Sequence, residues 1–191
     1  MVLIGKKKKM TRLYIEDTSV PCTIVDLSGN LIAKKNDSGY TVGMGVERNI
    51  GKQKLGIFRK LGFVPKYTIS DSQPTELEVG SKVEVDAVCK VGEKLTLHAI
   101  SKGRGFAGVM KRWGMKGGKK TRGQGITQRH QGSIGSQTPG KVWKGKHMAG
   151  RMGSDMVTYK NVEILKIEGS TVWLKGVVPG GKENIVYIYK K

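Results

Sequence analysis

A long stretch without any acidic residue constrains this chain more than any other feature. From Lys94 to Ser154, 61 residues contain no Asp and no Glu, but they contain 14 Lys or Arg and 14 Gly. The stretch therefore supplies +14 of the formal net charge of +20. Because its cations repel one another and its apolar residues are too few for a core, it cannot fold by itself. We expect it to become ordered only against a partner that is dense in negative charge.

The charge of the whole chain narrows the class of that partner. An excess of 35 Lys and Arg over 15 Asp and Glu is typical of proteins that bind nucleic acid or an anionic membrane. A phosphate backbone presents a charge every few ångströms and releases counterions when it is neutralised. Membrane is the weaker alternative, because no apolar stretch approaches the ~20 residues of a spanning helix and the basic stretch has no long apolar face.

Other residue types exclude several kinds of site. The first ten residues have a four-residue apolar part followed by Lys6–Lys9, which is the reverse of a secretory signal. These lysines are either a solvated charge run or part of a nucleic-acid contact. Cys22 and Cys89 lie in strand-like segments, so we expect buried thiols rather than a disulfide or a metal site. The three His have no Cys or second His at ligand spacing, and we expect neither a metal nor a cofactor.

Short β-branched or alternating segments flank the acid-free stretch on both sides. Because Gly-rich turns separate them, the sequence predicts a mainly β fold, in the form of a barrel. Between Gly51 and Thr68, Leu55, Phe58 and Leu61 recur at helical spacing, which predicts a short helix or helical turn. The predicted strands are Thr11–Glu16, Cys22–Leu27, Gly39–Glu47, Ser81–Val88, Lys94–Ile100, Met156–Ile167, Thr171–Val178 and Asn184–Tyr189.

The acid-free stretch is therefore an insertion between strands and not a tail. We predict a globular β-barrel domain made of residues 1–100 and 154–191, with a partly helical insertion at 50–74. Residues 101–153 are predicted to form a Gly/Lys/Arg-rich looped extension. Loops of this length without a core of their own are either functional or disordered.

Gly103, Gly105 and Gly108 fit the pattern G-x-G-x-x-G directly after a predicted strand. A dinucleotide site also needs an acidic residue about 20 positions later, and none occurs before Asp155. We instead interpret residues 101–112 as a clamp on a nucleic-acid backbone, in which glycines permit close approach and cations neutralise phosphates. The segment from Phe106 is predicted to begin a helix whose N-terminus faces a phosphate. The alternative is a flexible, solvated basic loop.

The aromatic and imidazole side chains of the stretch have two interpretations. Trp113, Trp143, His130 and His147 are candidates for stacking on unpaired bases, which RNA offers more often than duplex DNA. For the two tryptophans, packing at the base of the loop is an equal alternative, whereas Trp173 lies in a predicted strand and is expected in the core. Catalysis finds no support in the stretch, because general acid–base chemistry uses carboxylates or a His that one orients. A carboxylate supplied by the barrel leaves an enzyme disfavoured but not excluded.

Three blocks of the basic stretch resemble a known family. They are Ser101–Trp113 (SKGRGFAGVMKRW), His130–Gly135 (HQGSIG) and Thr138–Gly153 (TPGKVWKGKHMAGRMG). Together with the N-terminal Ile4–Lys7 and the closing Val177–Gly181, they closely resemble the bacterial-type ribosomal large-subunit protein 3 family. The resemblance covers essentially the whole chain in order.

The resemblance implies a translation-protein-type β-barrel on the outside of the large subunit, with an extension that threads through large-subunit (23S-type) rRNA toward the peptidyl-transferase centre. It implies a structural protein that binds rRNA early in subunit assembly, beside neighbouring large-subunit proteins. No enzyme activity, membrane, cofactor, metal or small-molecule substrate is implied. Gln137 aligns with a glutamine that some members carry methylated. We expect a cytoplasmic location in the ribosome, or an organellar stroma if the gene is plastid-encoded.

Two functions from other classes stay open as alternatives: an RNA-modifying or nucleotide-dependent enzyme, and a free nucleic-acid chaperone or DNA-compacting protein.

Residue by residue, the resemblance and the charge pattern give a candidate rRNA-binding set and a set of glycines at which the backbone is expected to approach the RNA closely. The candidate side chains are Lys6, Lys7, Lys102, Arg104, Lys111, Arg112, Trp113, Lys116, Lys119, Lys120, Arg122, Arg129, His130, Lys141, Trp143, Lys144, Lys146, His147 and Arg151, and the glycines are Gly103, Gly105, Gly108, Gly132, Gly135, Gly145 and Gly150.

Overall fold

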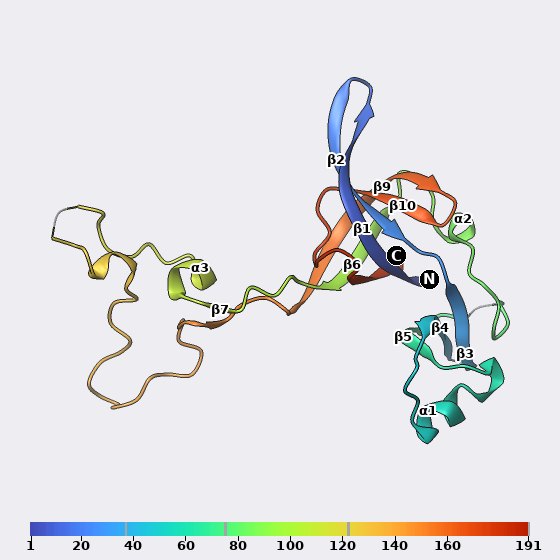
Figure 1. Cartoon of the computed structure of the whole chain (residues 1–191), viewed down its shortest axis with the longest axis horizontal. Helices are drawn as coiled ribbons and strands as arrows, with labels where there is room; N and C mark the ends of the chain where they lie inside the picture. Colours follow the sequence, from blue (N-terminus) through green and yellow to red (C-terminus); the bar gives the residue numbers. More distant parts are fainter. Residues whose placement is uncertain (37, 75, 122, 191) are drawn as a thin grey trace. The chain divides into compact units, whose positions relative to one another are not determined.

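β-strands dominate the fold, seen in a computed structural model that describes residues 1–36, 38–74, 76–121 and 123–190 (Figure 1). The mainly β prediction is confirmed. The strands are β1 Val2–Ile15, β2 Thr18–Asp26, β3 Asn30–Asn36, β4 Gly39–Val46, β5 Pro65–Asp71, β6 Lys94–Ile100, β7 Phe106–Ala107, β8 Gly150–Arg151, β9 Met156–Glu168, β10 Thr171–Lys175 and β11 Ile185–Lys190. The helices are α1 Lys52–Ile57, α2 Val85–Val88 and α3 Val109–Trp113, with 3-10 turns η1 Arg59–Leu61 and η2 Thr127–Arg129.

The chain divides into two compact units, which are described separately. Unit 1 consists of Met1–Ser101 and Met156–Lys191, and unit 2 consists of Lys102–Asp155. In unit 1, six strands pair antiparallel in the closed order β1-β11-β6-β9-β10-β2, because β1 also pairs with β2. Three further strands of unit 1 form a separate antiparallel sheet in the order β3-β4-β5.

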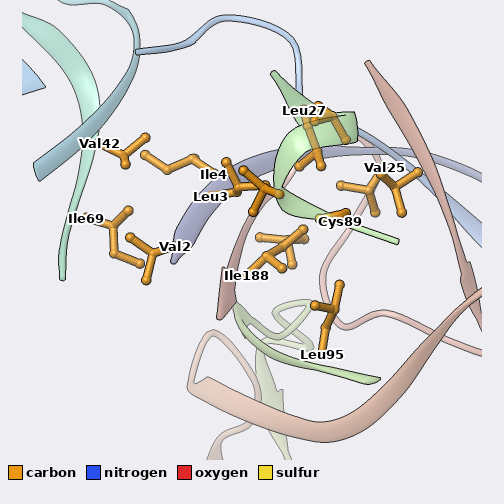
Figure 2. Close-up of a cluster of buried hydrophobic side chains, with 14 of the residues drawn as sticks. Val2, Leu3, Ile4, Val25, Leu27, Val42, Ile69, Cys89, Leu95 and Ile188 are labelled. Carbon is orange, nitrogen blue, oxygen red and sulfur yellow. The ribbon is translucent and has the colours of Figure 1, made fainter. Parts of the chain in front are cut away.

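The core of unit 1 follows from alternation along the strands. In β6, Leu95, Leu97 and Ala99 are at most 1% exposed while the residues between them face outward, as a period of two requires. Figure 2 shows side chains of the barrel strands gathered with Val42 and Ile69 of the β3-β4-β5 sheet. One continuous apolar cluster therefore holds the barrel and the smaller sheet together.

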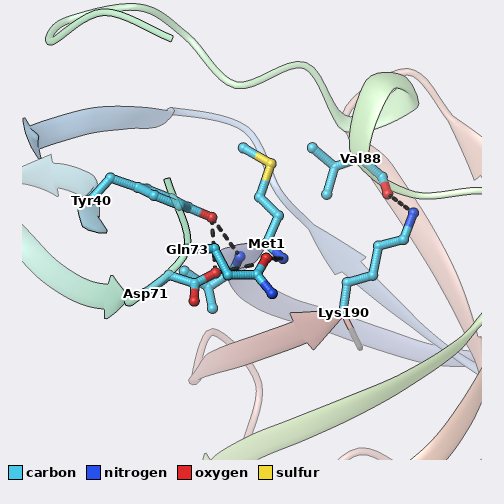
Figure 3. Close-up of polar contacts among 7 residues, drawn as sticks. Met1, Tyr40, Asp71, Gln73, Val88 and Lys190 are labelled. Atoms are coloured by element: carbon cyan, nitrogen blue, oxygen red, sulfur yellow. Dashed lines mark hydrogen bonds and ion pairs between the residues drawn. The ribbon is translucent and has the colours of Figure 1, made fainter. Parts of the chain in front are cut away.

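Polar contacts fix the points where this core meets the smaller sheet. Asn30, which is 2% exposed, donates to the carbonyl oxygens of Ile4 and Leu27 and accepts a hydrogen bond from the amide of Ile4. The Tyr40 hydroxyl donates to Asp71 at 3.0 Å (Figure 3), and burial raises the pKa of Tyr40 to about 12. These bonds satisfy buried polar groups, which would otherwise cost free energy.

Several element predictions are confirmed and one is wrong. The strand predicted at Lys94–Ile100 has those bounds, and α1 and η1 fall inside the predicted Gly51–Thr68 segment. The predicted strand Ser81–Val88 is wrong: Lys82 forms an isolated bridge with Leu31, and residues 85–88 are helical. Val85 and Val88 are both buried, and a spacing of three places side chains on one face of a helix, not of a strand.

Four strands were not predicted, and β1 is much longer than predicted. β3, β5, β7 and β8 have no counterpart among the predicted strands, and β1 begins at Val2 instead of Thr11. The first residues of β1 are almost fully buried, and the strand that they begin continues through the lysines that follow. The two cysteines are free and buried, as expected, and burial raises the pKa of both thiols, that of Cys89 to about 11.

Candidate nucleic-acid interface

Unit 2 begins and ends in a short antiparallel ladder. Phe106 pairs with Arg151 and Ala107 with Gly150. The ladder continues outward, since the Arg104 amide donates to the Met152 carbonyl at 2.9 Å and the Met152 amide donates to Gly105 at 3.0 Å. The two arms of the loop are thus held side by side at their root by backbone hydrogen bonds.

A cluster of side chains, here called the root clasp, lies directly beyond this ladder. Arg112 and Trp113 both donate to the carbonyl oxygen of Met148, each at 2.9 Å. The Trp113 indole stacks on the His147 imidazole with ring centroids 4.0 Å apart and planes 7° apart, and the Arg112 guanidinium lies 5.0 Å from the indole centroid. Helix α3 was predicted from Phe106 onward, and it supplies the first arm's members of the clasp. Trp113 thus packs on His147 and Met148 at the base of the loop and is still 43% exposed, so its predicted stacking on a base stays a prediction.

Backbone packing at two glycines was missed by the sequence interpretation. A Cβ on Gly153 would lie 2.3 Å from the carbonyl oxygen of Lys102, and one on Gly117 would lie 2.1 Å from that of Gln128. Both residues have positive φ, 78° and 74°, a region that side chains rarely adopt. Their signal in the sequence was only their membership in a Gly-rich stretch, which does not distinguish packed glycines from open ones.

The seven glycines predicted to permit close approach behave differently from one another. Gly103 faces the Ser154 hydroxyl and Gly150 faces the Arg112 guanidinium, at 2.8 and 2.5 Å from the position of an added Cβ. For the others, no atom of the described chain apart from the adjoining residues lies within 4 Å of that position, and three of them have positive φ. These open glycines are Gly105, Gly108, Gly132, Gly135 and Gly145, with positive φ at the first, third and fifth.

Unit 2 has almost no core. Among its described residues only Ala107 and Val109 are buried. Large apolar and aromatic side chains are instead exposed, including Phe106 at 78%, Ile126 at 82% and Trp143 at 66%. Apolar area that is left in water at this density on a loop is typical of a surface that another molecule covers.

The predicted cations of unit 2 lie on its surface. Asp155 is the one carboxylate in the sequence of this unit, so nearly all of these charges lack an acidic partner within the unit. Arg122 lies outside the described residues. Lys102, Arg104, Lys111, Lys116, Lys119, Lys120, Arg129, Lys141, Lys144, Lys146 and Arg151 are exposed, as are His130, His147 and Gln137, and Arg112 is half-buried by the root clasp.

The two predicted lysines of unit 1 have different environments. Lys6 is half exposed and pairs with Glu183 at 2.6 Å, which raises the pKa of the ammonium. Lys7 is only 8% exposed, and its ammonium donates to the carbonyl oxygens of Val178 and Gly180 at 2.6 and 2.9 Å. Burial lowers the pKa of Lys7. Its assignment to the rRNA-binding set is therefore corrected: Lys7 is a buried group that holds the segment before β11.

The chemistry of the described residues restricts the kind of site. In the described part of the chain, no group of three or more His, Cys, Asp or Glu side chains is arranged to hold a metal ion. Among the same residues, no helix combines the length and the apolar character needed to cross a membrane. Unit 2 is a mostly exposed loop whose two arms are held together at their base by the ladder and the root clasp. It carries many cations and several exposed aromatic and apolar side chains. This combination suits a polyanion that also has flat apolar surfaces.

Comparison with known proteins decides the family. The family model for ribosomal protein L3 matches residues 48–176. The chain belongs to the ribosomal protein L3 family. Among L3 relatives, the large ribosomal subunit protein uL3 of Chlorobium phaeovibrioides is 40% identical over 97% of this chain and 96% of its own length. The uL3 proteins of Thermosipho melanesiensis and Thermotoga maritima are each 37% identical over 98% of this chain and over 96% and 95% of their own lengths. The L3 family is structural and non-enzymatic, which removes the enzyme alternative.

Proposed function

We propose that this chain is a structural constituent of the large ribosomal subunit, in which unit 2 binds large-subunit (23S-type) rRNA directly. The observation that carries the proposal is that unit 2 has one carboxylate, many exposed cations and two buried side chains among its described residues. A segment of this composition gains stability from phosphate contacts and not from a core. The printed names of its relatives, large ribosomal subunit protein uL3, support the same assignment.

The different structures of the two units suggest that each has its own role in binding to the subunit. Unit 1, proposed to be a translation-protein-type barrel, anchors the protein on the surface of the subunit beside neighbouring ribosomal proteins. Unit 2, proposed to be the looped extension of residues 101–153, enters the rRNA and reaches toward the peptidyl-transferase centre. An extended chain spans up to ~3.3 Å per residue, so two arms of about 25 residues can reach tens of ångströms into the RNA.

The mechanism is positional and not chemical. The cations of unit 2 neutralise phosphates from separate rRNA segments, and the open glycines let the backbone lie against the RNA without a side chain between them. Exposed Trp143 and His130 stack on unpaired bases. Because these contacts join segments that otherwise repel one another, the protein supports early assembly of the subunit. Gln137, exposed in a turn closed by the Gly140 amide, is the proposed methylation position.

Sedimentation of the tagged chain from its native lysate at high salt tests the function. Exposed charge contacts weaken steeply with salt, whereas a loop that is enclosed by folded RNA is retained. We expect stoichiometric retention on the large subunit at ~1 M salt, where the screening length is about 3 Å. Complete release into the protein fraction would contradict the proposal and return the chaperone alternative.

A further inference from the structure

Unit 1 contains a second basic segment that the sequence interpretation did not assign. Between Glu47 and Asp71 the chain has no carboxylate but has six cations, at Arg48, Lys52, Lys54, Arg59, Lys60 and Lys66. Lys54 pairs with Glu47 at 2.8 Å. Among the described residues, no ion pair is formed by the remaining five. The segment therefore carries five surface charges without an acidic partner in the described part of the chain.

This segment builds one wall of a groove, here called the α1 groove. A hollow of about 600 Å³ is lined by residues of β3 and by the α1–η1 turn. Its cations come from both sides, since Lys34 and Lys35 lie on β3 and Arg59 and Lys60 lie on η1. All four are exposed, and no described lining residue carries a carboxylate. The groove is thus a concentrated positive site on unit 1.

Apolar groups in and beside the α1 groove remain uncovered. Helix α1 has no buried residue, so no other part of the described chain covers it. Ile57 lines the groove and is 56% exposed, and Leu55 is 46% exposed. The half-buried ring of Phe58 lines both this groove and an adjoining hollow of about 310 Å³. A helix that is left without a buried face is stable only when a partner packs on it.

We propose that the α1 groove is a second RNA-binding site, which holds the phosphate backbone of an rRNA segment between Lys34–Lys35 and Arg59–Lys60 and stacks an unpaired base on Phe58. The inference rests on the proposed rRNA-binding function and extends it from unit 2 to unit 1. RNA fits better than an acidic protein segment, because it supplies regularly spaced anions together with flat aromatic faces. Arg59 offers a planar fork that matches phosphate geometry.

The first test measures the salt dependence of binding to transcribed large-subunit rRNA. In the full chain, the double variant Arg59→Ala/Lys60→Ala removes two groove cations, and Lys160→Ala/Lys182→Ala removes two exposed cations elsewhere in unit 1. The logarithm of the binding constant K falls linearly with log salt, and removing one phosphate contact reduces the magnitude of this slope by ~0.7–0.9. We expect the groove variant to reduce the magnitude of the slope by about 1.4–1.8 and the control variant to leave the slope unchanged. Equal effects of the two variants would overturn the site in favour of diffuse charge attraction.

The second test locates the RNA by hydroxyl-radical cleavage from a tethered iron chelate in assembled subunits. Because both native cysteines are buried, the chelate can be placed at Lys60→Cys in the groove or at Lys144→Cys in unit 2. We expect each position to cut rRNA, at different nucleotides. Cleavage from position 144 alone would overturn the α1 groove but leave the proposed function intact, and cleavage from neither would overturn both. Modification of a neighbouring protein instead of RNA at position 60 would mean an acidic protein partner.

Discussion

Two neighbouring lysines of β1 show how burial separates residues of the same chemistry. Lys6 is half exposed and pairs with Glu183, whereas the Lys7 ammonium is enclosed and bonded to two carbonyl oxygens. The sequence shows only four consecutive lysines, and the alternation of β1 then assigns one of them to the interior. This is why a charge run could not be divided into surface and core members from the sequence.

Substitution of these two lysines tests that difference. We expect Lys7→Ala to lower the free energy of unfolding by about 2–4 kcal/mol, because hydrogen bonds to charged groups contribute ~1.5–3 kcal/mol. The buried carbonyl of Val178 and the partly buried carbonyl of Gly180 both lose their donor. Lys6→Ala is the matched control and should cost much less than Lys7→Ala, because it removes only an exposed ion pair. Urea unfolding of the full chain measures both. Equal losses would show that Lys7 is not held as the structure indicates.

The tryptophans of unit 2 give a second prediction at the residue scale. Trp143 is 66% exposed, so Trp143→Ala should leave the free energy of unfolding within about 0.5 kcal/mol of the parent. Its affinity for large-subunit rRNA should fall by about 1–3 kcal/mol, the value of one base stack. Trp113→Ala is the contrasting variant, since it breaks the root clasp and should speed proteolysis after Lys146 and Arg151. Unfolding of unit 1 by Trp143→Ala would mean that the residue belongs to a core.

At the scale of elements, the root of unit 2 depends on close backbone packing. We expect Gly153→Ala to cost about 1–3 kcal/mol locally, because its φ of 78° disfavours a side chain and its Cβ would meet the Lys102 carbonyl. Hydrogen exchange at the Arg104 and Met152 amides should accelerate correspondingly. Gly125→Ala is the control, since an added Cβ there meets no described atom beyond the adjoining residues within 4 Å, and it should leave these amides protected. The same protection in both variants would contradict the ladder.

The elements also show what the sequence can and cannot predict. Both bounds of β6 were predicted correctly, because its alternating side chains and the turn before it indicate the same strand. The buried positions of β6 follow that alternation. The segment Ser81–Val88 misled because Val83 and Val85 alternate, whereas Val88 is buried at helical spacing from Val85. In unit 2, the charges were predictable from composition, but composition did not separate open glycines from packed ones, and it gave no sign of the root clasp. The root clasp joins Arg112 and Trp113 to a residue 36 and 35 positions later, and such a pairing has no local signal.

At the scale of the whole molecule, acid should destabilise the fold of unit 1. Glu93, Glu163 and Glu183 each accept a hydrogen bond from a lysine ammonium, which lowers the pKa of each carboxyl below its ordinary 4.5. A carboxylate with a depressed pKa stabilises the fold above its unfolded pKa, and that contribution disappears as the pH falls through the folded value. The Tm should therefore be nearly constant from about pH 7 to about pH 5 and fall below that.

Glu93→Gln checks the origin of this acid sensitivity. The variant removes the ion pair with Lys190, which lies at 2.9 Å and whose ammonium also donates to the Val88 carbonyl (Figure 3). Its Tm should lie below that of the parent at neutral pH and converge on it in acid, where the parent carboxyl is protonated too. A constant difference in Tm at every pH would assign the effect to packing and not to charge.

The two units should also separate in an experiment on the whole chain. Deleting residues 110–148 removes ten Lys and Arg but keeps β7, β8 and all of unit 1. Since the core cluster lies entirely in unit 1, we expect its Tm to change little. For rRNA binding, the slope of log K against log salt should become shallower by ~0.7–0.9 for each phosphate that the deleted segment neutralises. A residual slope should remain, and adding Arg59→Ala/Lys60→Ala to the deletion should reduce it further. An unchanged slope after the deletion would assign the rRNA contacts to unit 1 alone.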